Sequence, residues 1–160
     1  MADARQLVDR ARVQCQINRI TYSDRIPVDA LAKRICDFKQ SFTQYGGSRP
    51  FGTALLIAGV DDNGLHLYET DPSGAYQSYH AGAIGRGRNT VVDFFENNWK
   101  PNLTLNAGIK MGLEALRESI EAKLNKDAVE IAVIDESGYR VLSREDTIAH
   151  IDKLKPAYDE

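Results

Sequence analysis

Apolar residues in the first part of the chain recur with the period of an α-helix. They fall every three or four positions from Ala4 to Cys15, while arginine, aspartate and glutamine occupy the other faces. This spacing predicts an amphipathic helix that starts with the first residues. Because no capping sequence precedes Ala2, we expect that an upstream segment is missing from the sequence.

A second apolar stripe runs from Leu31 to Phe42 and predicts a second helix. Pro27 suits the first position of this helix, because the N–H that proline lacks would be unpaired there in any case. Gly46 and Gly47 are expected to end the helix, because glycine readily adopts the left-handed conformation that closes helices.

Three extended stretches then predict an antiparallel meander. Residues 53–60 are rich in apolar side chains, and the Asp-Asp-Asn-Gly sequence at 61–64 is typical of a hairpin turn. A second stretch ends at the Asp-Pro-Ser-Gly turn of residues 71–74, and residues 75–84 are expected to form the third strand. Turns this short join antiparallel rather than parallel strands.

The following sequence predicts two helices and a hairpin. A short helix runs to Trp99, and Thr104 is expected to cap a longer helix whose apolar face reaches Ile120. Two strands are predicted at 129–134 and 139–142, on either side of a Glu-Ser-Gly turn.

The last part of the chain completes the prediction of the fold. Ser143 is expected to cap a final helix, and the charged residues 155–160 to form a frayed tail. Helices beside two groups of antiparallel strands predict an α+β fold in a single domain, residues 1–160. Five strands are few for this number of helices, so we expect that part of a sheet is missing.

Composition and charge narrow the range of functions. Of the 160 residues 27% are charged, and 20 basic against 23 acidic residues give a formal net charge of −3. This balance lacks the clustered positive charge of a nucleic-acid-binding protein. No apolar run approaches the ~20 residues that span a bilayer, and the first residues do not resemble a signal peptide. We therefore expect a cytoplasmic protein that binds neither nucleic acid nor membrane.

No residues form a recognisable catalytic or metal-binding motif. His66 and His80 fall in predicted strands and His150 on the last predicted helix, and none lies in a motif for nucleophilic catalysis. Cys15 and Cys36 lie among apolar neighbours without the spacing of a zinc site, which favours two buried thiols over a disulfide. We expect no cofactor and no metal.

Residues 82–87 are rich in glycine and superficially resemble a phosphate-binding loop. They lack the order and the βαβ context of such loops, so a tight connection from strand to helix is the better interpretation. The alternative of an anion at the start of that helix, beside Arg86 and Arg88, stays open.

Five short sequences point together to a known family. They are residues 2–5, 10–12, 45–52, 67–74 and 83–87, which read ADAR, RAR, YGGSRPFG, LYETDPSG and AIGRG. In this order they resemble the α-type subunits of the 20S proteasome. The RPFG and TDPSG sequences are similar to the α type, and the catalytic β-type relatives differ there.

The resemblance implies both a fold and a function. The fold is a four-layer αββα sandwich of antiparallel sheets flanked by helices, like that of N-terminal nucleophile hydrolases. The function is that of a non-catalytic structural subunit of a threonine-type endopeptidase complex, in an outer seven-membered ring that gates the passage of unfolded proteins. In this family the nucleophile is the N-terminal threonine of the β-type subunit, whereas here Met1 comes first and Thr21 lies inside the chain.

The implied partners are other α subunits, β subunits, ATPase or other activator rings, and unfolded polypeptide substrates. By resemblance, the turn of Tyr45, Gly46, Gly47 and Ser48 lines the opening through which the substrate passes, and Arg49 anchors this turn. Glycines let the backbone approach closely around a narrow ring that only an extended chain can pass. The alternative is that these glycines only end a helix, and both can hold.

The resemblance also assigns other positions. Ala2 and Asp3 are implied to edge the pocket that receives the C-termini of activators. The structural turns of the family correspond to Asp71, Gly74, Gly85 and Gly87.

The chain departs from the family pattern at its start. Family members carry a gating tail, a helix and several strands before the position of Ala2. We therefore expect a fold that lacks its N-terminal strands and a chain that needs a partner to cover apolar surface. Two other hypotheses stay open: a divergent N-terminal nucleophile hydrolase with a processed N-terminus, and a stand-alone assembly factor with the same fold.

Overall fold

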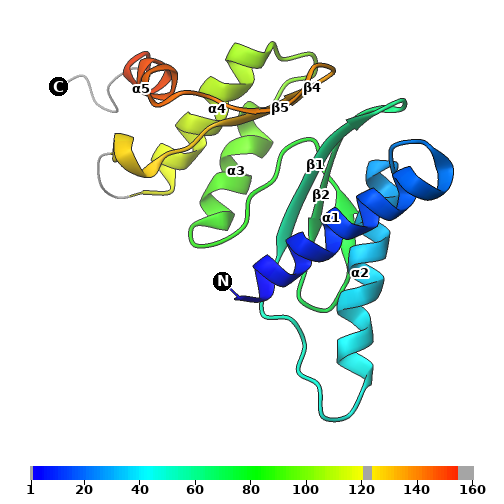
Figure 1. Ribbon diagram of the computed structural model, residues 1–160. Coiled ribbons are helices and arrows are strands. Elements are labelled where there is room, and N and C mark those ends of the chain that lie inside the picture. The colour runs from blue at the N-terminus through cyan, green and yellow to red at the C-terminus, as the bar shows by residue number, and fades with distance from the viewer. Residues whose placement is uncertain (1, 121–123, 155–160) are drawn as a thin grey trace. The chain divides into compact units, whose positions relative to one another are not determined.

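The computed structural model describes residues 2–120 and 124–154, which fall into two compact units (Figure 1). The first unit covers residues 1–84 and the second residues 85–160. The predicted single domain over 1–160 stays a prediction. The tail predicted at 155–160 lies outside the described residues.

The first unit consists of two helices and one antiparallel sheet. Helix α1 covers Ala2–Tyr22 and α2 covers Val28–Gln44, which confirms both predicted helices. The sheet has the order β1-β2-β3, with strands Leu55–Asp61, Gly64–Thr70 and Tyr76–Ser78. Strands β1 and β2 pair in register from Leu55 opposite Thr70 to Asp61 opposite Gly64. Helix α2 lies against this sheet and α1 packs on α2 (Figure 1).

The core of the first unit joins both helices to β1. Its buried centre is Leu7 from α1, Ile35 from α2 and Phe51 from the segment before β1. The partly buried residues packed against it are Ala11, Leu31, Phe38, Phe42, Leu55 and Ile57. Most of these residues belong to the two predicted helical stripes, so the stripes mark the faces that meet.

Three predictions about this unit are wrong in detail. Helix α2 is ended not by Gly46 and Gly47 but by Tyr45, whose φ of −93° and ψ of 124° are extended. Pro27 is not the first helical residue but the cap before it, because its ψ of 145° is extended. The third strand covers only Tyr76–Ser78 instead of residues 75–84, so His80 lies outside it. Tyr79 still donates its N–H to the Leu67 carbonyl at 2.9 Å. The paired register of β2 and β3 ends at Tyr68 opposite Ser78.

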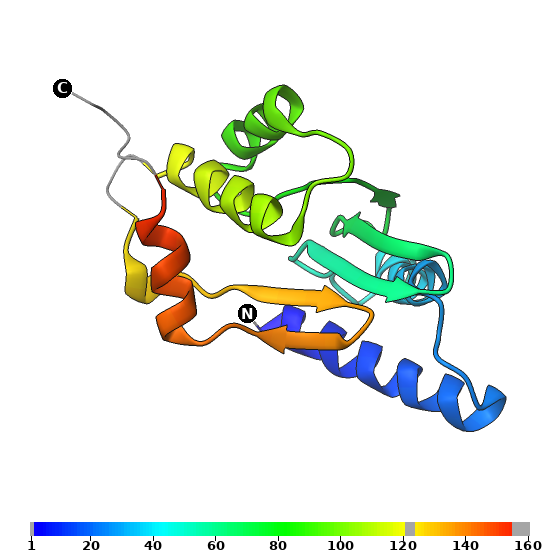
Figure 2. The ribbon, with the colours of Figure 1, turned by 90° about the horizontal axis from the view of Figure 1, so that it is seen from above.

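In residues 85–120 and 124–154, the second unit has three α-helices, a short 3-10 helix and a hairpin. The elements are α3 (Arg88–Asn98), α4 (Leu105–Glu118), η1 (Lys126–Ala128), β4 (Ala132–Asp135), β5 (Gly138–Val141) and α5 (Arg144–Asp152). The β4–β5 hairpin leads directly into α5 (Figure 2). The buried core of the second unit is formed by Leu113, Leu124 and Ile151.

The predicted caps in the second unit are confirmed. The Thr104 hydroxyl accepts from the N–H of Ala107 at 3.3 Å, and the Ser143 hydroxyl accepts from the N–H of Asp146 at 3.0 Å. The strand predicted at 129–134 begins only at Ala132. Residues Val129 and Ile131 instead pack against the core of this unit, directly after the 3-10 turn.

Both cysteines have free thiols. Cys36 is buried and Cys15 is half-buried. Burial raises the pKa of the Cys36 thiol to about 11. Within residues 2–120 and 124–154, no helix is long and apolar enough to span a bilayer.

Candidate functional site

The turn of residues 45–48 follows directly after α2 and is exposed. Tyr45 keeps 71% of its surface accessible, and the Ser48 N–H donates to the Tyr45 carbonyl at 3.3 Å. Gly47 adopts a φ of 84°, and among the described residues no atom lies within 4 Å of the position that a Cβ would take at Gly46 or Gly47. The four residues therefore form a tight turn whose tip is exposed to solvent.

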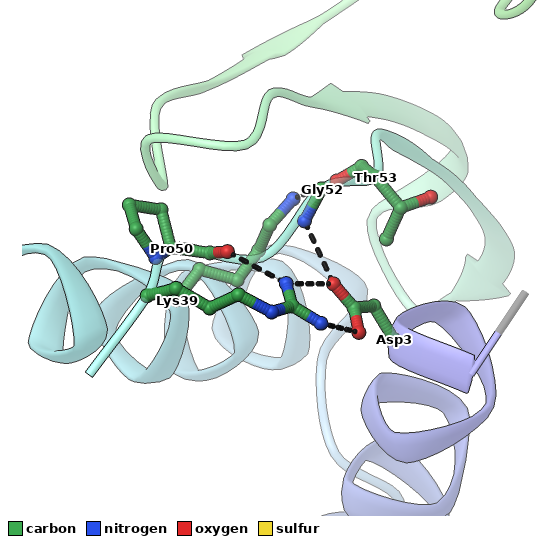
Figure 3. A network of polar contacts seen from close by, with 6 residues as sticks. Asp3, Lys39, Pro50, Gly52 and Thr53 are labelled. Atoms are coloured by element: carbon green, nitrogen blue, oxygen red, sulfur yellow. Dashed lines mark hydrogen bonds and ion pairs between the residues drawn. The ribbon is translucent and has the colours of Figure 1, made fainter.

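Arg49 and Asp3 join the base of this turn to the first turn of α1. Figure 3 shows Asp3 facing the segment that carries Pro50 and Gly52. The two guanidinium nitrogens of Arg49 donate to the two Asp3 carboxylate oxygens, each at 2.7 Å. The Gly52 N–H donates to the same carboxylate at 2.9 Å, and Arg49 also donates to the Pro50 carbonyl at 3.1 Å. Such a two-pronged contact fixes direction as well as distance.

This network sets the charge state of its members. The Arg49 hydrogen bonds, with the Gly52 N–H, hold the pKa of the Asp3 carboxyl well below its usual range. The same contact raises the pKa of Arg49. Both groups are therefore charged across the neutral pH range.

Phenylalanine side chains fill the space behind the turn. The rings of Phe38, Phe42 and Phe51 have centroids 4.9 to 5.6 Å apart, at the tilted or edge-on angles that aromatic pairs prefer. The Arg10 guanidinium lies 4.8 Å from the centroid of the Phe38 ring. Beside the turn there is a cavity of about 210 Å³, lined by Asp3, Gln6, Phe42, Ser48, Arg49 and Phe51.

The family resemblance gives Arg49 the role of anchoring the turn and Asp3 that of edging the activator pocket. The structure joins these two residues in one ion pair. Ala2 lies next to Asp3 at the exposed start of α1. No sequence signal indicates the pairing, because the two residues are 46 positions apart.

The turn of residues 71–74 is built around the Asp71 carboxylate. One of its oxygens accepts from the Ser73 hydroxyl at 2.6 Å and from the N–H groups of Ser73, Gly74 and Ala75 at 2.8 to 3.1 Å. These bonds, the Ser73 hydroxyl first, lower the pKa of Asp71. Gly74 has a φ of 95°, and a Cβ there would lie 2.6 Å from the Cys36 carbonyl oxygen of α2. The turn is thus packed on the helix backbone.

The glycines before α3 have a similar structural use in the second unit. Gly85 and Gly87 both have positive φ, and Gly87 is the cap of α3. A Cβ at Gly87 would lie 3.0 Å from the Cβ of Ser119, at the end of α4. The anion site beside Arg86 and Arg88 stays a prediction.

The hairpin turn at residues 61–64 also holds the start of α2. Asp61 accepts from the Val28 N–H at 3.0 Å and the Asn63 N–H at 2.8 Å, and lies 2.9 Å from His66 Nε2. The two N–H groups, Val28 first, lower the pKa of Asp61. In the described part of the chain, no group of three or more histidine, cysteine, aspartate or glutamate residues could hold a metal ion.

A model of a known protein family, described as Proteasome subunit, matches residues 1–134. The chain belongs to the proteasome subunit family. The family match and the mixture of helices with antiparallel sheets agree with the predicted α+β fold of the N-terminal nucleophile hydrolase type.

Several curated relatives in this family carry the name Proteasome subunit alpha. The protein from Methanopyrus kandleri is 51% identical over 144 residues, which is 90% of this chain and 58% of that protein. Those from Methanosarcina acetivorans and Methanosarcina thermophila are 47% and 46% identical over 96% and 100% of this chain. The chain spans 63% and 66% of the length of these two relatives.

One residue of the candidate site, Lys39, is not indicated by any of the sequence motifs. Lys39 of α2 is completely buried, and its Nζ donates to the Thr53 carbonyl and the Thr70 hydroxyl, each at 2.9 Å. A signal exists in the sequence, because Lys39 lies four positions after Ile35 on the apolar face of the helix. A lysine inside an apolar stripe could have indicated a buried amine.

Proposed function

We propose that this chain is a non-catalytic structural subunit of a proteasome core, in an outer seven-membered ring that gates the passage of unfolded proteins. The name Proteasome subunit alpha of the relatives supports the α type. The observation that carries the proposal is the turn at Tyr45–Ser48, which is exposed at its tip and yet fastened at its base by Arg49 and Asp3. A residue that lines an opening needs both properties.

The physical role of the turn is to exclude by size. Gly46 and Gly47 add no side chain at the tip, so several copies of the turn could approach one another closely. The opening between them would admit an extended chain and reject a folded protein. Peptide cleavage would then be the work of β-type subunits, within a threonine-type endopeptidase complex.

The remaining assignments belong to the same proposal. The partners would be other α subunits, β subunits and an ATPase or other activator ring, and the complex would work in the cytoplasm. Ala2 and Asp3 would edge the activator pocket, next to the cavity beside the turn. Because the Asp3 carboxylate already binds Arg49, it would shape this edge rather than pair with an incoming charge.

The proposal is tested by co-expression with a β-type subunit, followed by electron microscopy and activity measurements. We expect rings with sevenfold symmetry that cleave both short peptides and unfolded proteins. The variant Gly46→Trp adds bulk where no atom lies within 4 Å. It is expected to slow the degradation of an unfolded protein by about tenfold, or 1.4 kcal/mol, while a short peptide is cleaved at the normal rate.

The matched control is Asn63→Trp, which adds the same bulk to the exposed hairpin turn at the other end of β1. It should leave both rates unchanged. Particles without sevenfold rings would contradict the ring proposal and favour an assembly factor. Peptide cleavage by the purified chain alone, with a processed N-terminus in mass spectrometry, would favour the hydrolase instead.

A further inference from the structure

The segment that carries the proposed turn joins the end of α2 to the start of β1, and the described structure ties it down at few points. Arg49 and Gly52 hold its middle to Asp3, and Phe51 packs in the aromatic cluster. Its last part, at Thr53, is held by Lys39. The Lys39–Thr53 hydrogen bond spans 14 positions of sequence, and it ties the helix that the segment leaves to the point where the segment joins the sheet.

Burying Lys39 at this position carries a desolvation penalty. Taking an ammonium group out of water costs several kcal/mol unless partners compensate for it. Lys39 has 0% of its surface exposed, and its described partners are a carbonyl and a hydroxyl. No ion pair to a carboxylate is found for it within residues 2–120 and 124–154. Burial accordingly lowers the pKa of this amine.

The hydroxyl of Thr70 connects the amine to the sheet. Thr70 is the last residue of β2 and is fully buried. Its Oγ1 accepts from Lys39 Nζ at 2.9 Å and from the N–H of Leu55, the first residue of β1, at 3.2 Å. The amine of Lys39 and the hydroxyl of Thr70 thus together join α2, the end of the turn segment and the end of the β1–β2 ladder. Figure 3 shows Lys39 and Asp3 approaching the segment of residues 50–53 from two different helices.

We propose that Lys39, through Thr53 and Thr70, is a positioning residue that fixes the turn of Tyr45–Ser48 against α2 and the sheet, and so maintains the opening for unfolded substrates. The claim that the opening is maintained rests on the proposed function. The claim that Lys39 fixes the turn does not. An apolar residue would fill the same space at a lower desolvation cost, but it could not bind a backbone carbonyl and a strand-end hydroxyl together.

The first test measures native-state hydrogen exchange on the full 160-residue chain. Lys39→Met removes the amine and keeps an unbranched side chain, and Thr70→Val removes the hydroxyl and keeps the shape. Two reporter amides are those of Ser48 and Gly52, which donate to Tyr45 and Asp3 rather than to Lys39 or Thr70. We expect both variants to speed exchange at these amides about tenfold more than in the β1–β2 ladder around Ala58.

Two further variants separate positioning from a loss of stability. Thr70→Ser keeps the hydroxyl and should restore slow exchange at Ser48 and Gly52. Val28→Ala removes packing at the far end of α2 and should speed exchange in the turn and in the ladder alike. If Lys39→Met and Thr70→Val change the reporter amides no more than the ladder, the positioning role is overturned.

The second test uses particles assembled with a β-type subunit. In Lys39→Met and Thr70→Val particles we expect the rate for an unfolded protein, divided by the rate for a short peptide, to fall roughly threefold, because a mobile turn obstructs the wider chain more. Thr70→Ser should keep the normal ratio. An unchanged ratio despite faster exchange would overturn the link to the opening. Absence of rings would refute the proposed function alone, because the exchange experiment still decides the role of Lys39.

Discussion

At the scale of single residues, polar groups decide the geometry of the candidate site. Asp3 receives three hydrogen bonds, two from Arg49 and one from Gly52, so a single carboxylate orients the base of the exposed turn. Lys39 holds the end of the segment through its hydrogen bond to the Thr53 carbonyl, and the same amine binds the Thr70 hydroxyl of β2. In both cases an ionisable side chain holds backbone of the segment between α2 and β1.

Asp3 makes the stability of the first unit dependent on pH. Its folded-state pKa lies below the unfolded value, so its contribution is complete above about pH 5 and is lost as the pH falls towards the folded pKa. We expect Asp3→Asn to lower the free energy of unfolding at pH 7. The difference from the natural chain should shrink below about pH 4, as measured by urea unfolding across this range.

The control for this prediction is Asp9→Asn. Asp9 pairs with Arg12 at 3.4 Å on the surface of α1, and exposed pairs of this kind contribute little. Its effect at pH 7 should therefore be small. A loss for Asp3→Asn that stays constant down to pH 2 would show that shape, and not charge, is what matters at residue 3.

At the scale of elements, α2 is held at several points along its length. Asp61 binds its first N–H, and a Cβ at Gly59 of β1 would lie 2.6 Å from a methyl group of Val28. Gly74 lies against its middle, and Lys39 binds the sheet from its second half. The helix that carries the proposed turn is therefore fixed to the sheet at its start, its middle and its second half.

Gly74 offers a direct test of this packing. Gly74→Ala forces a side chain into a positive-φ position and against the α2 backbone, where a Cβ would lie 2.9 Å from the Gln40 nitrogen. We expect the free energy of unfolding to fall by about 2–4 kcal/mol. Urea unfolding followed by circular dichroism measures this change.

Gly46→Ala is the matched control for Gly74→Ala, because Gly46 has no neighbouring atom within 4 Å and no positive φ. Its effect should stay within about 0.5 kcal/mol. Equal effects at the two glycines would mean that the turn at residues 71–74 is not packed on α2 as described.

At the scale of the whole molecule, the distribution of exposed apolar residues is informative. Val13, Ile17 and Ile20 of α1 lie four and three positions apart, so they share one face of the helix, and Ile20 is 82% exposed. In the second unit, Leu105, Tyr139 and Val141 are also exposed. Large exposed apolar groups that share a face are typical of a surface that contacts another protein.

We therefore predict that the purified chain associates with itself when no other subunit is present. Light scattering should give a mass well above that of one chain, and Ile20→Glu should reduce the association. Gln77→Glu adds the same charge at an exposed position of β3, away from this face of α1, and should reduce the association less. A monodisperse monomer that melts cooperatively would contradict this prediction.

The sequence by itself determined the features that depend on near neighbours. The two helical stripes, the caps at Thr104 and Ser143 and the turns at residues 61–64 and 71–74 all follow from residues within a few positions of one another. The motifs that indicated the proteasome subunit family are of the same local kind. Such signals can be read along the chain because the atoms that interact are already close in it.

Only the tertiary structure decided which distant groups meet. Arg49 pairs with Asp3 across 46 positions, Asp61 with Val28 across 33 and Lys39 with Thr70 across 31. The early end of the third strand is also a long-range effect. Pairing of β2 and β3 ends at Ser78, and whether it continues depends on where the rest of the fold directs the chain after β3. Hydrogen bonds of this kind form only after the helices have packed on the sheet, so their partners leave no periodic pattern in the sequence.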